Sequence, residues 1–312
     1  MQSGKGAKAV EICVLHMGWK SDEDKYRQRC YALLEYQQAG KTEYAVRCFT
    51  EEDEADTALC WMNPRLAQDF EKAYQKFLQE AEQGNGFAMH DLGRMFADGL
   101  GRDADVGLAQ KWYEKALEAF LVREESVKKK EKPYLQYRIG KMYASGLGAE
   151  QNYEKAAHWF SQAAAMDHKY AQYSLAGLYR RGRGVEQNDI RAFSLYMSSA
   201  EQGNPYASLE LAKMYRDGFG TEPAPKLAER GFQDAYSGFV MLEEKSHDDK
   251  LQYRIGQMLH TGTGTSKDDE GAARYWEKSA KLGNINAQYA LGTLWLETGS
   301  GDSGQAVEWL TK

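Results

Sequence analysis

The chain has 312 residues, and its 40 Lys and Arg against 46 Asp and Glu give a formal net charge of −6 at pH 7. A chain of this length can bury a large core or form two domains, and its acidic balance argues against a protein built to coat nucleic acid. The sequence contains no run of 18 apolar residues and no signal-peptide pattern at its start. We therefore expect a cytoplasmic protein without a membrane partner.

The first 62 residues contain no repeated pattern. The stretch DKYRQRCYALLEYQQAG, 24–40, reads as a helix, and the acidic run EEDEAD, 51–56, reads as a solvated turn or a helix start. All four cysteines lie in this segment, at Cys13, Cys30, Cys48 and Cys60. Their spacing fits no zinc site, so we interpret them as reduced structural thiols. We expect 1–62 to be a helical segment that caps the array of helices following it.

A repeated pattern occupies 63–312. After a single helix-like stretch, RLAQDFEKAYQKFLQEAEQGN, a small residue recurs every 36 to 47 positions. These small residues are Gly93, Gly140, Ala176, Ala212, Gly256 and Gly292. Each is followed by a G-x-G pair, and the first five pairs are followed in turn by an alanine. A fixed period of this length predicts a stacked array of helices.

Each unit reads as two helices separated by the G-x-G pair. Glycine readily adopts positive φ, so the pair is expected to end the first helix. A short polar residue then starts the second helix, as at Asp105, Asn152, Asn188 and Asp268. The second helix carries a large aromatic residue near its middle and in several units ends in A-x-x-G-N, where Gly followed by Asn is a stop signal.

Two units have longer second helices than the others. The stretches KALEAFLVREESVKKKEKP and QDAYSGFVMLEEKSHDD both run into an identical hexapeptide, LQYRIG, at 135–140 and 251–256. A tandem duplication of a three-unit block explains this most simply. The alternative is that both hexapeptides satisfy the same packing environment, and the two explanations predict the same fold.

The combination of small residue, G-x-G pair, alanine and second-helix aromatic resembles the Sel1-like repeat family, relatives of tetratricopeptide repeats. The resemblance implies an all-α, right-handed α/α superhelical solenoid that binds other proteins and carries no catalysis. The long-helix units, with YSGF and TGTGT, also resemble to a lesser degree the repeat regions attached to MobA/MobL-type relaxases of Gram-positive plasmids. Since AVEWLTK stops within a second helix, we expect the chain to be a fragment of a longer protein.

The sequence contains no pattern that predicts catalysis, a metal or a cofactor. The six histidines are scattered one to an element, and no pair has ligand spacing on a helix. GKT at 40–42 lacks the glycine that a phosphate-binding loop needs, and the G-x-G pairs follow no strand. We therefore expect no enzyme activity.

The first helices present a candidate binding face. Positions i, i+4 and i+7 of each share one side, and together they predict a concave groove with a tyrosine ladder. The candidate groove residues are His90, Arg94, Tyr137, Lys141, Tyr173, Arg180, Lys213, Arg216, Tyr253 and Tyr289. Tyr and Arg supply binding energy well, and the basic residues of the first four units favour an acidic or C-terminal carboxylate peptide.

Two alternatives to this groove remain open. The tyrosines would equally serve to pack neighbouring first helices together. The cluster YRRGRG, 179–184, could contact phosphates and favour an accessory nucleic-acid module of a mobilisation protein. We give the first place to a protein-interaction scaffold.

Overall fold

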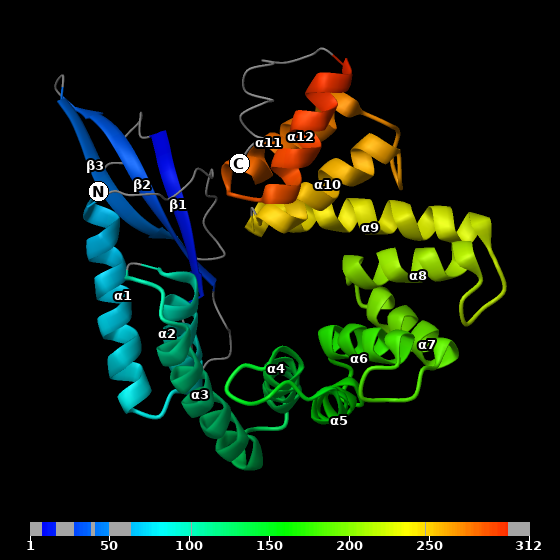
Figure 1. The fold of residues 1–312 in the computed structure, drawn as a ribbon, viewed down its shortest axis with the longest axis horizontal. Coiled ribbons are helices and arrows are strands. Elements are labelled where there is room, and N and C mark those ends of the chain that lie inside the picture. Colours follow the sequence, from blue (N-terminus) through cyan, green and yellow to red (C-terminus); the bar gives the residue numbers. More distant parts are fainter. Residues whose placement is uncertain are drawn as a thin grey trace. The chain divides into compact units, whose positions relative to one another are not determined.

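The computed structural model describes the backbone of residues 8–16, 28–38, 41–49, 64–100, 102–246 and 248–298. The chain divides into an N-terminal part, residues 1–163, and a C-terminal part, residues 164–312. Figure 1 traces both parts. The N-terminal part contains strands β1 (Lys8–His16), β2 (Gln28–Gln38) and β3 (Lys41–Phe49) and helices α1 (Pro64–Glu82), α2 (Gly86–Asp98), α3 (Val106–Ser126), α4 (Lys132–Ser145) and α5 (Tyr153–Ala164).

The C-terminal part is entirely helical over its described residues. Its helices are α6 (Lys169–Arg181), α7 (Asp189–Glu201), α8 (Pro205–Asp217), α9 (Pro225–Ser246), α10 (Asp249–Thr261), α11 (Asp269–Lys281) and α12 (Ile285–Thr298). From α2 onward the helices pair as first and second helices of consecutive repeats, and α12 is the first helix of a sixth repeat. The expected all-α repeat fold is confirmed for these helices, and α1 is the predicted single second helix.

The helix predicted for 24–40 is wrong. Residues Gln28–Gln38 form β2, the central strand of an antiparallel sheet in the order β1-β2-β3. Leu34 of β2 pairs with Ala9 of β1 and with Ala45 of β3. The local composition of β2 suits a helix, but strand pairing on both sides satisfies its backbone groups. The acidic run 51–56 lies outside the described residues.

The turns between the two helices of a repeat follow the sequence pattern closely. The first glycine of five G-x-G pairs adopts the left-handed conformation and ends its helix, as at Gly146, where φ is 69° and the amide donates to the carbonyl of Met142. The four predicted N-caps also form. Asp105, for example, accepts a hydrogen bond of 2.8 Å from the amide of Leu108. These interactions pair backbone groups that helix ends otherwise leave unsatisfied.

The glycine and the asparagine of each G-N pair between repeats have different roles. The glycine ends the second helix with positive φ, as at Gly203. The asparagine then starts the next first helix, because the side chain of Asn204 accepts from the amide of Tyr206 at 3.2 Å. Asn85 caps α2 in the same way, and Asn284 accepts from the amide of Ala287 at the start of α12. Asparagine is therefore a start signal here and not part of the stop signal.

The small residue of a repeat makes room for the aromatic residue of its second helix. A Cβ atom placed on Gly140 would lie 2.6 Å from Cδ1 of Phe160, and Gly93 meets the ring of Tyr113 in the same way. In the C-terminal part Gly256 meets the indole of Trp276. The predicted close approach of the two helices is thus confirmed, and it rests on a ring lying directly on a glycine backbone.

The second glycine of the G-x-G pair lets neighbouring repeats approach. A Cβ atom on Gly148 would overlap the main-chain carbonyl of Tyr113, in the second helix of the preceding repeat. Gly220 meets the carbonyl of Asp189 and Gly264 that of Phe232 in the same manner. Because main chain moves aside less readily than a side chain, any residue larger than glycine is costly at this position.

The long second helices α3 and α9 contact the repeated hexapeptide in the same way. In the N-terminal part Gln136 donates to Glu124 of α3 at 2.7 Å. In the C-terminal part Gln252 donates to Glu243 of α9 at 2.9 Å. The guanidinium carbons of Arg138 and Arg254 each lie 5.4 to 6.0 Å from the centroids of the nearest aromatic rings. Both copies therefore occupy the same packing environment.

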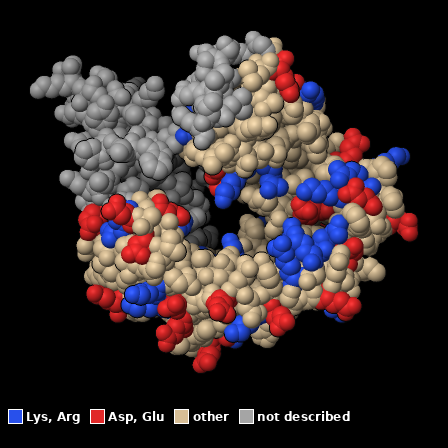
Figure 2. Space-filling model, viewed as in Figure 1, with Lys and Arg blue, Asp and Glu red and all other residues tan. Residues whose placement is uncertain are grey.

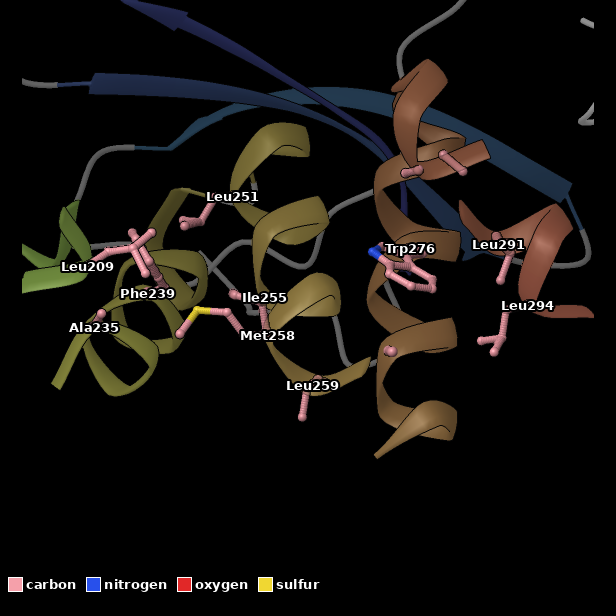
Figure 3. Close-up of a cluster of buried hydrophobic side chains, with 13 residues drawn as sticks. Leu209, Ala235, Phe239, Leu251, Ile255, Met258, Leu259, Trp276, Leu291 and Leu294 are labelled. Atoms are coloured by element: carbon pink, nitrogen blue, oxygen red, sulfur yellow. The ribbon is translucent and has the colours of Figure 1, made fainter. Parts of the chain in front are cut away.

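Figure 3 shows a core of the C-terminal part, which runs from Leu209 of α8 to Leu294 of α12. Phe239 of α9, Ile255 of α10 and Leu291 of α12 are fully buried in it. Trp276 of α11 lies between Ile255 and Leu291 and donates its indole N–H to the carbonyl of Tyr253 at 3.1 Å. This core holds three successive first helices in a fixed order. None of the helices in the described ranges has the length and apolarity needed to cross a membrane.

Candidate functional site

Two pockets lie on the predicted face of the first helices, one in each part of the chain. The first, the α2–α4 pocket, has a volume of about 550 Å³ and is lined by α2, the second helix α3, α4 and the residue Leu147 that follows it. The second, the α10–α12 pocket, has a volume of about 320 Å³ and is lined by α10, α11 and α12. Each therefore lies between the first helices of two consecutive repeats and is completed by the second helix between them.

The two pockets use the same positions of the repeat. In the α2–α4 pocket, positions i and i+4 of the two first helices place His90, Arg94, Tyr137 and Lys141. In the α10–α12 pocket the same positions place Tyr253, Gln257, Tyr289 and Thr293. The second-helix aromatics Tyr113 and Trp276 also correspond, since each follows the small residue of its own repeat, Gly93 or Gly256, by 20 positions.

The α2–α4 pocket carries three cationic side chains. Arg94, Arg138 and Lys141 line it together with the carboxylates of Asp91 and Asp98. Arg94 and Lys141 form no ion pair with any residue of the described ranges, whereas Arg180, Lys213 and Arg216 on other first helices do. The pocket therefore holds positive charge that the protein itself leaves uncompensated.

These charges shift the pKa values of neighbouring side chains. Burial, and then repulsion from Arg138, Arg94 and Lys141, holds the pKa of His90 well below its usual value, so His90 is neutral at pH 7. The pKa of Lys141 is lowered by desolvation and then by Arg138, although solvent still reaches its side chain. Burial also raises the pKa of Tyr113 to about 12, which keeps its hydroxyl protonated.

His90 lies at the side of this pocket against Tyr113. The two ring centroids are 5.2 Å apart in an edge arrangement. Nδ1 of His90 is buried and has no hydrogen-bond partner among the described residues, its nearest carboxylate oxygen being Oδ1 of Asp91 at 3.8 Å. A buried polar atom without a hydrogen bond is costly, and it is commonly satisfied by a water or a ligand.

The α10–α12 pocket is lined mostly by uncharged groups. The hydroxyl of Tyr253 accepts from Gln257 at 2.9 Å, and the ring of His260 lies 5.3 Å from that of Trp276. Nδ1 of His260 is 2.7 Å from Oδ1 of Asp269, so this histidine is already partnered. Tyr289 is 66% exposed and stands at the side of the pocket, where it is available for contact.

The remaining predicted residues lie outside both pockets. Tyr173 of α6 is half-buried, with its ring 5.7 Å from Tyr196 and 6.1 Å from Tyr206, and desolvation raises its pKa. It therefore packs between helices, in line with the second interpretation of the tyrosines. Tyr137 lines a pocket and also packs between helices, since its ring lies 5.9 Å from that of Phe160.

The three basic residues predicted for the groove in the third and fourth repeats are each paired with an acid. Arg180 contacts Asp189 at 3.1 Å and lies 4.0 Å above the ring of Phe219. The other two pairs are Lys213 with Glu210 at 2.7 Å and Arg216 with Asp217 at 2.7 Å. Figure 2 shows Lys and Arg gathered over α6 to α8 with Asp and Glu beside them. The predicted positive character of this stretch is thus largely neutralised at short range.

Sequence reasoning missed four of the groups that shape the α2–α4 pocket. Asp91 and Arg138 occupy position i+1, beside the predicted face, and Asp98 lies one turn beyond Arg94. Tyr113 comes from the second helix, and its 20-residue distance from Gly93 was the available signal. Among the residues that the structure describes, no three His, Cys, Asp or Glu side chains are grouped to hold a metal ion.

The comparisons with known proteins bear on the repeat itself. A family model described as Sel1 repeat matches residues 86–119, 133–168, 169–204, 205–230, 250–284 and 285–312. The six matches begin within one residue of the starts of α2, α4, α6, α8, α10 and α12. A search of the curated proteins finds no match.

Several solved structures are similar to the chain. A Sel1 repeat protein from Oxalobacter formigenes is 26% identical, with 78% of this chain and 97% of that one covered and a TM-score of 0.49. A protective antigen present in uropathogenic Escherichia coli strains, with an SLR fold, is 22% identical, with 76% and 55% covered and a TM-score of 0.42. An immunity protein from Pseudomonas aeruginosa is 17% identical, with 72% and 84% covered and a TM-score of 0.40. The chain spans about half the length of the E. coli antigen.

Proposed function

Because the chain belongs to the Sel1 repeat family, we propose that it is a non-catalytic scaffold that binds a peptide or a partner domain along the face of its first helices. Sel1 repeat proteins are generally non-catalytic scaffolds. The observation that carries the finer proposal is the recurrence of one pocket at the same repeat position in both parts of the chain. A packing defect would have no reason to recur in register.

The size and lining of the pockets suit side chains of a partner. Volumes of about 550 and 320 Å³ accommodate one or two side chains each. Both pockets combine aromatic rings with polar groups, which is the composition that dominates binding energy at protein interfaces. Tyrosine adds a large contact area at the cost of ordering only two torsions, so Tyr137 and Tyr289 are suitable anchors.

The alternative of a nucleic-acid module has less support. Of the three arginines in the cluster YRRGRG, Arg180 is engaged by Asp189, and the chain carries a net charge of −6. Affinity for nucleic acid depends on basic side chains that are free to neutralise phosphates. The scaffold proposal uses residues that the fold leaves accessible.

Affinity capture from a bacterial lysate, followed by titration of the captured protein, tests this function. The variant carries Tyr137→Ala and Tyr289→Ala, and a second variant carries Tyr289→Ala alone, because an exposed tyrosine is removed without loss of packing. The matched control carries Val122→Ala and Ile190→Ala, which remove apolar side chains of similar exposure, 67% and 69%, away from both pockets. Circular dichroism checks that all variants fold.

The expected result is a partner that binds the wild type and the control equally and binds the double tyrosine variant at least about tenfold more weakly. Loss of binding in the control together with retention in the folded tyrosine variants would place the interaction elsewhere on the chain. Equal binding by all four proteins would reject the first-helix face as the site.

A further inference from the structure

We propose that the α2–α4 pocket is an anion-binding site that takes a carboxylate or a phosphate group. The inference deepens the proposed function and rests on it in one respect only, which is that the anion belongs to the bound partner.

The cations of the pocket are placed to act on one group. Arg94 of α2 and Lys141 of α4 occupy the same i+4 position of consecutive first helices and line the same 550 Å³ space. Neither forms an ion pair with a described residue. Arg138, one turn before Met142 on α4, lines the pocket as well. A guanidinium and an ammonium that line one space, from the helices on its two sides, are the groups that bind carboxylates and phosphates most strongly.

The acidic residues of the pocket do not cancel this charge. Asp91 is 4% exposed at the side of the pocket, and Asp98 is exposed near the end of α2. With His90 neutral, the lining therefore has three positive and two negative side chains. Like charges brought together in a partly desolvated space repel, and an incoming anion relieves that repulsion.

An anion would also satisfy a polar atom that the fold leaves without a hydrogen bond. His90 lines the same space, and its Nδ1 is buried and has no hydrogen-bond partner in the described part of the chain. In the tautomer protonated at Nδ1 it donates to an acceptor such as a carboxylate oxygen. Neutral His90 thus adds a directional donor to the charge of Arg94 and Lys141.

The α10–α12 pocket provides an internal comparison. At the positions of Arg94, Arg138 and Lys141 it carries Gln257, Ala290 and Thr293. Its histidine, His260, is already bonded to Asp269. The same backbone frame therefore occurs once with three cations and once with none, which means that the repeat does not require the charges for folding.

The test follows the histidine side chains by NMR while small anions are added. The protein is labelled with 13C at histidine Cε1, and its resonances are assigned with His90→Gln and His260→Gln variants. Inorganic phosphate and acetate are titrated separately at pH 8 and at constant ionic strength. The two probes distinguish a phosphate source from a carboxylate source, and His260 reports on the uncharged pocket in the same sample.

We expect a saturable shift of the His90 resonance with at least one anion and no saturable shift of His260. In the Arg94→Gln, Lys141→Gln double variant the apparent Kd should rise at least tenfold. The control variant, Gln257→Ala with Thr293→Ala, should respond at His90 as the wild type does. A linear drift of His90, an equal response of His260, or an unchanged Kd in the double variant would overturn the proposal.

Failure of this site and failure of the proposed function are distinguishable. If a partner binds the wild type and the Arg94→Gln, Lys141→Gln variant with equal affinity, the scaffold proposal stands. The proposal that the partner supplies an anion to this pocket is then rejected. A saturable His90 response in a protein that binds its partner without Tyr137 and Tyr289 would leave a small-anion site and remove the first-helix face as the docking surface.

Discussion

Single residues set the closest approaches in this protein, and glycine holds the tightest of them. Gly148 and Gly84 both adopt positive φ, at 74° and 83°. A Cβ on Gly148 would overlap the carbonyl of Tyr113, whereas nothing lies within 4 Å of a Cβ on Gly84. Alanine variants at these two glycines therefore separate the free-energy cost of the backbone conformation from the cost of a collision with main chain.

We expect Gly84→Ala to lower the free energy of unfolding by about 1 kcal/mol, which is the cost of the left-handed conformation for alanine. Gly148→Ala should lower it by about 3 kcal/mol or more, because the backbone must also move. Chemical denaturation of both variants measures the difference. Equal losses would mean that the α4–α5 turn is free to shift away from α3.

The charge around His90 gives a second prediction at this scale. The groups that face His90 are Arg94, Arg138 and Lys141, with Asp91 and Asp98 as the opposing carboxylates. Burial lowers the pKa of His90 most and the cations lower it further, so the removal of one cation should raise it toward the ordinary value. Lys141→Met is therefore expected to raise the pKa of His90, as measured by NMR titration.

At the scale of helices, the long second helices are fastened to the next repeat by buried polar contacts. Gln252 donates to Glu243, which is 5% exposed. Gln136 donates to Glu124, but there Lys132 also contacts the carboxylate at 3.2 Å. Lys132 thus contacts the carboxylate of Glu124, and the carboxylate of Glu243 is the more deeply buried of the two.

Gln252→Leu should therefore destabilise the protein by about 1 to 3 kcal/mol, since a buried carboxylate loses a donor. Gln136→Leu should cost less, because Lys132 continues to contact Glu124. Thermal or denaturant unfolding of the two variants gives the order. The reverse order would show that Lys132 contributes little to holding α3 against α4.

The helices and their ends were predictable because their signals are local. Gly146 ends α4 and Asp105 starts α3 through contacts with residues at most four positions away. The sheet was not predicted, because QRCYALLEYQQ is locally suited to a helix and its strand state depends on pairing with β1 and β3. The alternation of Val10, Ile12 and Val14 in the sequence was the available signal for β1.

The candidate site was predictable in its positions but not in its charges. Repeat periodicity brought His90, Arg94, Tyr137 and Lys141 to one face, and all four line one pocket. Whether a basic residue is free depends on partners from other turns or helices. Arg180, for example, meets Asp189 of the next helix. Such pairings depend on the folded arrangement of the helices, which the repeat spacing alone does not specify.

At the scale of the whole chain, a repeat protein gains stability from contacts between neighbours. A local defect should then loosen its own repeats and leave distant ones intact. Hydrogen exchange of the Gly148→Ala variant should show faster exchange in α3 to α5 and unchanged exchange in α10 to α12. Uniformly faster exchange would indicate that the described repeats unfold as a single cooperative unit.

The recurrence of one pocket with different linings has a consequence for how selectivity changes in such a chain. The frame comes from the glycines and aromatics of the repeat, while the ligand preference comes from two positions on each first helix. Preference should therefore be transferable by substitution without remaking the fold. Gln257→Arg with Thr293→Lys is expected to give His260 the saturable response to anions predicted for His90. Each pocket would then be an independent binding site. Substitutions in an evolving or engineered chain could change the ligand of one pocket while the others keep theirs.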